Sequence, residues 1–162
     1  MEAKIIEVCM GQMEISESPT RLITRGLGSC LGITLYDPNK RIGGLGHPML
    51  PDIDRARIKS NQSRFVNSVI VQMVETLEKM GCTRAGLVAK IFGGAHMFSF
   101  IATDSYLNVG QKNIEMALTK LKEMNIKVIA QEVGGTFGRT VELNLETGKV
   151  MVSTVSWGEK EI

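Results

Sequence analysis

Hydrophobic and polar positions repeat with two different periods along the chain, and each period predicts a different kind of element. Apolar residues recur at helical spacing over about residues 61–80 and again over about 111–124, which predicts two amphipathic helices. Residues 31–36, 139–146 and 149–157 instead alternate with a period of two, which predicts half-buried strands. The chain is therefore expected to combine sheet and helix.

Turn residues connect these segments. Asp37-Pro38-Asn39-Lys40 predicts a tight turn, because Pro38 restricts φ and the flanking side chains can bond the backbone. Thr147-Gly148 predicts a second hairpin between the last two alternating segments. Further strands are expected at residues 3–14, 21–25, 41–50, 86–92 and 126–132. About eight strands and two helices predict one α+β domain over residues 1–162, a layered sandwich of mixed or antiparallel sheets with helices on sheet faces.

Composition narrows the function classes. The 162 residues are 43% hydrophobic and 22% charged, as expected for one globular domain. A net charge of +2, eight aromatic residues and no long basic run give no reason to expect nucleic-acid binding. No apolar run approaches the ~18 residues that span a bilayer, so no membrane insertion is expected. The N-terminus lacks the pattern of a signal peptide, which predicts a cytoplasmic protein.

Cysteine and histidine are few. Cys9, Cys30 and Cys82 are widely spaced and odd in number, which favours free thiols over a disulfide framework. No CxxC or HxxxH spacing occurs, so no metal site is expected, and nothing in the sequence calls for an organic cofactor. Any chemistry that needs an imidazole must use His47 or His96.

Cys30 is the strongest candidate for a nucleophile. It follows the turn Gly26-Leu27-Gly28-Ser29, whose backbone N–H groups can converge on a bound group. A thiol at this place can attack a carbonyl carbon while the N–H groups of the Gly28–Cys30 turn bind the developing oxyanion. The N–H groups of Ser29 and Cys30 are the main candidates for this role. The predicted hairpin brings His47 towards Cys30, and Thr24 on the preceding strand can fix the imidazole tautomer.

Ordinary structural interpretations remain open for each of these residues. Free cysteines are most often small buried hydrophobes, and this applies more strongly to Cys9 and Cys82 than to Cys30. A single histidine near glycine or proline is more often structural, which holds for His47 and for His96. Thr24 by itself indicates only a strand.

Two linked motifs add a family to this interpretation. The run Thr24–Cys30 (TRGLGSC), followed by Gly46–Pro51 (GHPMLP), resembles the signature of CheD, the chemoreceptor glutamine deamidase family of chemotaxis. Segments 64–67, 90–95, 109–113 and 132–135 also resemble that family, so the resemblance covers nearly the whole chain. Two departures are His96, where the family usually has Asn, and residues 136–138 after the second Gly-Gly pair.

The resemblance implies a specific reaction and specific partners. Cys30, His47 and Thr24 match the family's catalytic set, and the fold would be related to papain-like toxin deamidases. The implied substrate is a glutamine side chain on the cytoplasmic helical domain of a chemoreceptor, converted to glutamate through a Cys thioester without metal or cofactor. The family's other partner is the CheC phosphatase, which CheD binds and stimulates.

Other functions stay open at this stage. The chain can be chiefly a non-catalytic binding module that modulates CheC, or a Cys-dependent amidohydrolase acting on another amide; a redox switch through Cys30 ranks last. The sequence does not determine which receptor glutamines are modified, the docking surface, the oligomeric state, or the balance between the two roles.

Overall fold

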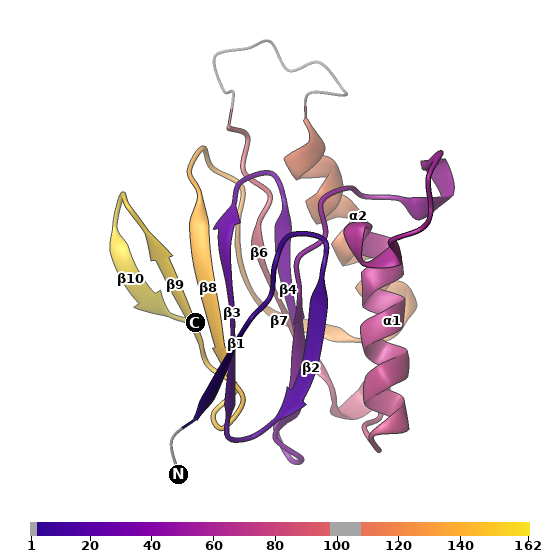
Figure 1. Cartoon of the computed structure of the whole chain (residues 1–162), viewed down its shortest axis with the longest axis vertical. Helices are drawn as coiled ribbons and strands as arrows, with labels where there is room; N and C mark the ends of the chain where they lie inside the picture. The colour runs from indigo at the N-terminus through magenta and orange to yellow at the C-terminus, as the bar shows by residue number, and fades with distance from the viewer. Residues whose placement is uncertain (1–2, 98–107) are drawn as a thin grey trace.

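A computed structural model describes residues 3–97 and 108–162 and shows two stacked five-stranded sheets with two helices on the outer face of one of them (Figure 1). The first sheet has the order β1 (Lys4–Glu7), β3 (Thr20–Leu27), β8 (Arg139–Asn144), β9 (Val150–Thr154) and β10 (Gly158–Glu161). The second has the order β2 (Met13–Glu17), β5 (Ile42–Gly46), β4 (Leu31–Asp37), β6 (Val88–Gly93) and β7 (Lys127–Val133). The predicted α+β class is confirmed.

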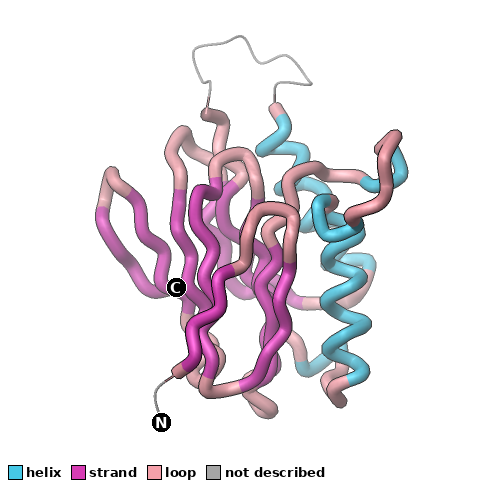
Figure 2. The backbone as a smooth tube through the Cα atoms, viewed as in Figure 1, coloured by secondary structure: helices cyan, strands magenta, loops and turns pink. Residues whose placement is uncertain are grey.

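Both helices lie against the second sheet, as Figure 2 shows in cyan beside the magenta strands. They are α1 (Val66–Lys79) and α2 (Val109–Glu123), and three short 3-10 turns accompany them: η1 (Ile53–Arg55), η2 (Gln62–Arg64) and η3 (Arg84–Gly86). The apolar stripe of α1 is buried against this sheet: Val66, Val69, Ile70, Met73, Val74 and Leu77. None of the helices in the described residues is long and apolar enough to cross a membrane.

The second sheet is covered on both faces, which divides the interior into two layers. Leu31, Ile33 and Leu35 of β4 point to the helices and join an apolar core there. The opposite face of β4 meets the first sheet, where Tyr36 packs with residues of β3, β8 and β9. A strand buried on both faces has few polar residues, as β4 does.

Several boundaries differ from the prediction. Residues 3–14 were expected to form one strand, and this is wrong: β1 and β2 belong to different sheets, and the chain crosses between them at a turn where Gly11 has φ +79°. β10 was not predicted. The helix expected from residue 61 begins at Val66, because Asn61 caps η2 by accepting a hydrogen bond from the Ser63 N–H.

Candidate active site

The hairpin of β4 and β5 aligns the nucleophile and base candidates. Ile33 pairs with Gly46, so His47, one residue beyond the end of β5, lies opposite Gly32. The Leu31 N–H donates to the Pro48 carbonyl at 3.2 Å and extends the pairing past the strand end. Cys30, two residues before Gly32, therefore lies on the same face as His47 at a diagonal position, which is within reach of long side chains. The predicted hairpin is confirmed, although His47 was expected on the return strand itself.

The face shared by Cys30 and His47 points to the first sheet. A Cβ placed on Gly32 would lie 2.9 Å from Leu27 Cδ1 and 3.8 Å from Thr24 Cγ2, both on β3. Cys30 packs at the edge of the apolar layer between the sheets. The candidate residues therefore come from two adjoining sheets, and their shared space exists only because the sheets stack.

Thr24 holds the imidazole of His47 in one tautomer. The Thr24 hydroxyl donates to the Val8 carbonyl at 2.6 Å, and Thr24 Oγ1 lies 2.7 Å from His47 Nδ1. Because the hydroxyl proton is already used, Thr24 Oγ1 can only accept from His47, so Nδ1 carries the ring proton. Nε2 is then the unprotonated nitrogen, which is the form that a general base requires.

His47 is kept neutral by its surroundings. Its side chain is 1% exposed, and burial lowers its pKa from 6.5 to about 4. Among the described residues, Nε2 is buried without a hydrogen-bond partner. A buried, unpartnered acceptor is costly, so it is a feature that needs an explanation beyond stability.

Cys30 rests as a thiol. It is partly buried, and burial raises the pKa of its Sγ above 9.0, while the backbone N–H of Cys30 itself acts against this rise. No hydrogen bond joins Sγ to His47 Nε2 within the described part of the chain. The structure thus brings Thr24 and His47 into contact and leaves Cys30 on the same face as a neutral thiol, with no resting thiolate–imidazolium pair.

The turn before Cys30 is held by three consecutive carbonyls. The Gly28 carbonyl accepts from the Ala95 N–H at 2.8 Å, and the Cys30 carbonyl accepts from the Gly94 N–H at 3.0 Å. Between them, the Ser29 carbonyl accepts from the side chain of Asn113 at 2.9 Å. The approach requires glycine at position 93, where φ is +95° and a Cβ would lie 2.4 Å from the Cys30 oxygen.

The amides of this turn divide into engaged and free donors. The Gly28 N–H donates to the Gly26 carbonyl at 3.0 Å and so serves the turn itself. The N–H groups of Ser29 and Cys30 make no backbone hydrogen bond within the described residues. These two remain as the candidate oxyanion donors.

The other thiols and the second histidine lie elsewhere. Cys9 is exposed on the chain between β1 and β2, and Cys82 is buried in the helix-side core. His96 donates its backbone N–H to the Gly135 carbonyl at 2.9 Å, and its Nε2 is buried without a partner among the described residues. The described residues hold no group of three or more side chains suited to a metal ion.

Sequence reasoning missed two buried polar groups near the turn. Arg139 of β8 is 2% exposed, forms an ion pair with Glu132 of β7 and stacks over Phe137 with 4.4 Å to the ring centroid. Asn113 of α2 is fully buried and bonds the Ser29 and Met49 carbonyls. Nothing local in segment 109–113 indicates that Asn113 has partners 84 and 64 residues away, and the alternating pattern around Arg139 predicts only a strand.

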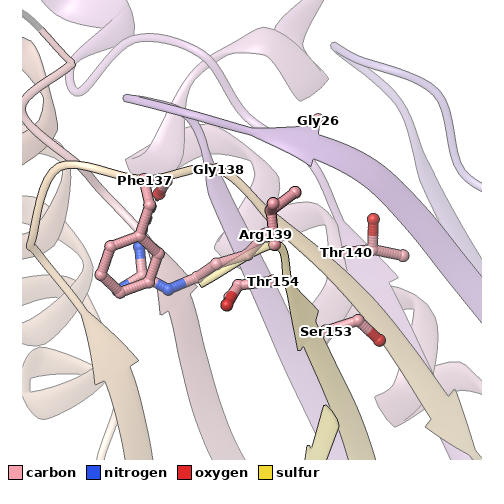
Figure 3. A pocket seen from close by; sticks show the side chains of 8 residues that line it. Gly26, Phe137, Gly138, Arg139, Thr140, Ser153 and Thr154 are labelled. Carbon is pink, nitrogen blue, oxygen red and sulfur yellow. Dashed lines mark hydrogen bonds between the residues drawn. The ribbon is translucent and has the colours of Figure 1, made fainter. Parts of the chain in front are cut away.

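An open groove lies beside the turn but excludes the candidate residues. Figure 3 shows Phe137 and Arg139 on one side of it, with Gly26 nearby on β3. Its lining consists of Gly26, Phe137, Gly138, Arg139, Thr140, Ser153, Thr154 and Val155. Cys30, His47 and Thr24 are absent from this lining, so the site must be assigned by its chemistry rather than by the shape of this groove.

Comparison with known proteins points to one family. The family described as CheD chemotactic sensory transduction matches residues 49–154. A Clostridium botulinum protein named probable chemoreceptor glutamine deamidase CheD is 43% identical over 162 residues, which is 100% of both chains. A Lachnoclostridium phytofermentans protein of the same name is 40% identical over 159 residues, 98% of this chain and 99% of the relative.

Solved structures give the fold only. A Neisseria meningitidis protein of the DUF152 family aligns with a TM-score of 0.51 at 8% identity, covering 83% of this chain and 65% of that one. Bacillus licheniformis hypothetical protein YfiH aligns with a TM-score of 0.50 at 13% identity, covering 81% and 59%. The expected relation to papain-like toxin deamidases stays a prediction.

Proposed function

The chain belongs to the CheD family, and from this premise we propose that it is a protein-glutamine deamidase that converts specific glutamines of chemoreceptors to glutamate. Cys30 is the nucleophile, His47 the general base and acid, and Thr24 the residue that orients the imidazole. The full-length relatives named as chemoreceptor glutamine deamidases support the reaction. The observation that carries the residue assignment is the Thr24–His47 bond, which leaves Nε2 unprotonated on the face shared with Cys30.

The first half of the reaction forms a thioester. His47 Nε2 takes the proton from Cys30 Sγ as the sulfur attacks the carboxamide carbon, and the C=O π electrons move to the oxygen. The N–H groups of Ser29 and Cys30 bind this oxyanion. When the intermediate collapses, the C–N bond breaks and His47 returns its proton to the leaving nitrogen, which departs as ammonia.

The second half restores the thiol. A water molecule gives a proton to His47 Nε2 and attacks the thioester carbon, the C–S bond breaks, and the sulfur regains the proton. The product is a glutamate side chain. Throughout, Thr24 Oγ1 accepts the Nδ1–H and keeps the ring oriented, in place of the carboxylate that serves other triads.

The resting protonation states affect the timing of these steps. Burial raises the pKa of Cys30 and lowers that of His47, so the thiolate–imidazolium pair is unfavourable before substrate binds. Proton transfer therefore accompanies attack on the amide. This protects the free enzyme's thiol from oxidation, because the thiolate is the reactive form.

The test uses a receptor cytoplasmic fragment as substrate. Wild-type protein and Cys30→Ala are incubated with the fragment, and the peptides are read by mass spectrometry for conversion of Gln to Glu. We expect site-specific conversion by the wild type and none above background for Cys30→Ala. Cys9→Ala is the matched control for the loss of a thiol, because the Cys9 side chain is exposed, and it should retain full activity.

A second arm separates the enzyme from the binding module. We propose CheC as a partner and the cytoplasm as the location, on the family resemblance alone. If wild-type protein converts no receptor glutamine while CheC stimulation survives Cys30→Ala, the deamidase proposal is wrong and the binding module replaces it. Conversion of free glutamine or unrelated proteins at the same rate would instead favour a general amidohydrolase.

A further inference from the structure

Asn113 joins the two chain segments that carry the nucleophile and the base. Its Nδ2 donates to the Ser29 carbonyl at 2.9 Å and to the Met49 carbonyl at 3.1 Å. Ser29 directly precedes Cys30, and Met49 follows His47 by two residues. The side chain is 0% exposed, and its two acceptors lie 84 and 64 positions away in the sequence.

The two bonds set the orientation of the amide. Both acceptors are carbonyl oxygens, so Nδ2, the atom with two N–H donors, must face them, and Oδ1 must point elsewhere. Oδ1 is buried without a partner among the described residues. Both N–H donors of the side chain thus bind these two carbonyls, and its acceptor has no partner among the described residues. An unpartnered buried acceptor lowers stability, so packing alone does not explain this residue.

The Ser29 carbonyl matters because it belongs to the peptide unit that carries the Cys30 N–H. In a trans peptide the C=O and N–H point to opposite sides. With the Ser29 carbonyl held towards α2, the Cys30 N–H points away from α2. That N–H lies near its own Sγ, where it lowers the pKa of the thiol, so it is on the side of the reacting atom.

Of the three peptide planes whose carbonyls hold this turn in the described structure, only the Ser29–Cys30 plane is held by a side chain. The carbonyls on either side, of Gly28 and Cys30, are held by the backbone amides of Ala95 and Gly94. The Ser29 carbonyl is held by Asn113. Removing the Asn113 amide therefore frees the plane that presents the Cys30 N–H, while the neighbouring planes keep their partners.

We propose that Asn113 is a positioning residue of the deamidase, which fixes the Ser29–Cys30 peptide so that the Cys30 N–H faces the oxyanion of the tetrahedral intermediate. This inference rests on the proposed function. As the C–S bond forms, the electrons of the substrate C=O bond move to oxygen, and this oxygen receives the Cys30 N–H. The bond to Met49 keeps the chain after His47 in register with the same turn.

The test separates oxyanion binding from general damage to the site. Alkylation of Cys30 by iodoacetamide needs a reactive and accessible sulfur but forms no oxyanion, whereas deamidation needs a reactive sulfur, access and oxyanion binding. For Asn113→Ala we expect kcat on the receptor fragment to fall about 10–100-fold and KM to stay within about threefold, while the rate of Cys30 alkylation, compared at a pH where the thiol is fully ionised, stays within about twofold.

Asn113→Asp keeps the volume of the side chain but has no donor when ionised, and it should show the same split if Asn113→Ala does not fold. The matched control is Asn67→Ala. Asn67 of α1 is also an amide that clamps a loop, donating to Asp52 at 3.0 Å and accepting from the Ile53 N–H at 3.1 Å, and within the described residues it forms no hydrogen bond to Ser29 or Met49. Its loss should leave kcat within about twofold.

Each other outcome overturns the inference. An unchanged kcat in a folded Asn113 variant shows that the clamp does not act on the reaction. A parallel fall in kcat and alkylation shows a structural role only. If the wild-type chain itself converts no glutamine, the proposed function fails and this inference fails with it. If the wild type is active but the Asn113 variants do not lose kcat selectively over alkylation, this inference alone fails.

Discussion

The layer between the two sheets contains polar side chains at both of its ends, and the two ends differ in whether all of their polar atoms are hydrogen-bonded. Near the end of β4, Tyr36 donates to the Leu145 carbonyl at 2.7 Å. Beside it, Lys90 Nζ donates to the carbonyls of Gly148 and Ile162, at 3.1 and 2.7 Å. Near the start of β4, Thr24 and His47 bond each other, but His47 Nε2 has no partner among the described residues.

The difference separates a structural polar site from the proposed reactive one. At the Tyr36 end every donor named above meets a backbone acceptor, which stabilises the fold without leaving a group to react. At the His47 end the contacts define the tautomer and leave one acceptor unused. An unsatisfied buried atom costs stability, and the proposed reaction explains it because Nε2 gains a partner when it takes the thiol proton.

The largest expected effect concerns the stability cost of keeping His47 neutral. The folded chain binds a proton at His47 only near pH 4, whereas the unfolded chain binds it near 6.5. As pH falls from about 6.5 to 4, the unfolded state therefore takes up a proton that the folded state refuses, and the free energy of unfolding decreases by roughly 3 kcal/mol. Above pH 6.5 this contribution is constant.

Urea unfolding of wild type and His47→Gln from pH 7.5 to 4.5 measures this term. Subtracting the free energy of unfolding of the variant from that of the wild type removes the contribution of the carboxylates, which titrate in both proteins. We expect the wild type to lose stability relative to the variant as the pH falls. A difference that stays flat over this range would mean that His47 is already protonated or solvated in the folded chain.

A smaller effect is expected from the residue that orients the imidazole. Thr24→Val keeps the shape of the side chain but removes the acceptor of the Nδ1–H, so the ring loses its fixed tautomer and kcat should fall about 10–100-fold. Thr24→Ser, which retains the hydroxyl, is the matched control and should stay within about threefold. Equal rates for both variants in the deamidation assay would remove Thr24 from the site.

The smallest effect should come from the structural end of the layer. Tyr36→Phe removes one buried hydrogen bond to Leu145, so the free energy of unfolding should fall by about 1 kcal/mol while deamidation stays within about twofold. Denaturant unfolding and the receptor assay check the two parts. Loss of activity without loss of stability would contradict the contrast between the two ends.

Much of the architecture could be predicted because local patterns carry it. The apolar stripe of α1 has helical spacing whatever it packs against, and Pro38 and Gly148 mark turns by their own backbone preferences. The segment at residues 3–14 was misassigned for the same reason. Its apolar residues favour a strand, a lone glycine is also compatible with a bulge inside one, and only pairing with two different sheets shows that the chain turns at Gly11.

The candidate site also has features that local sequence predicts and features that depend on tertiary structure. By itself, the sequence determined the α+β class, the two helices, the hairpin and the motif that singles out Cys30, His47 and Thr24, because spacing along one chain decides local geometry. Tertiary structure alone decided what these groups can do. Thr24 becomes a tautomer anchor only because the Val8 carbonyl takes its proton, and Asn113 reaches Ser29 only because α2 packs against the second sheet. Burial, which shifts the pKa of both His47 and Cys30, arises from the stacking of two sheets and one helical layer, and no local pattern encodes it.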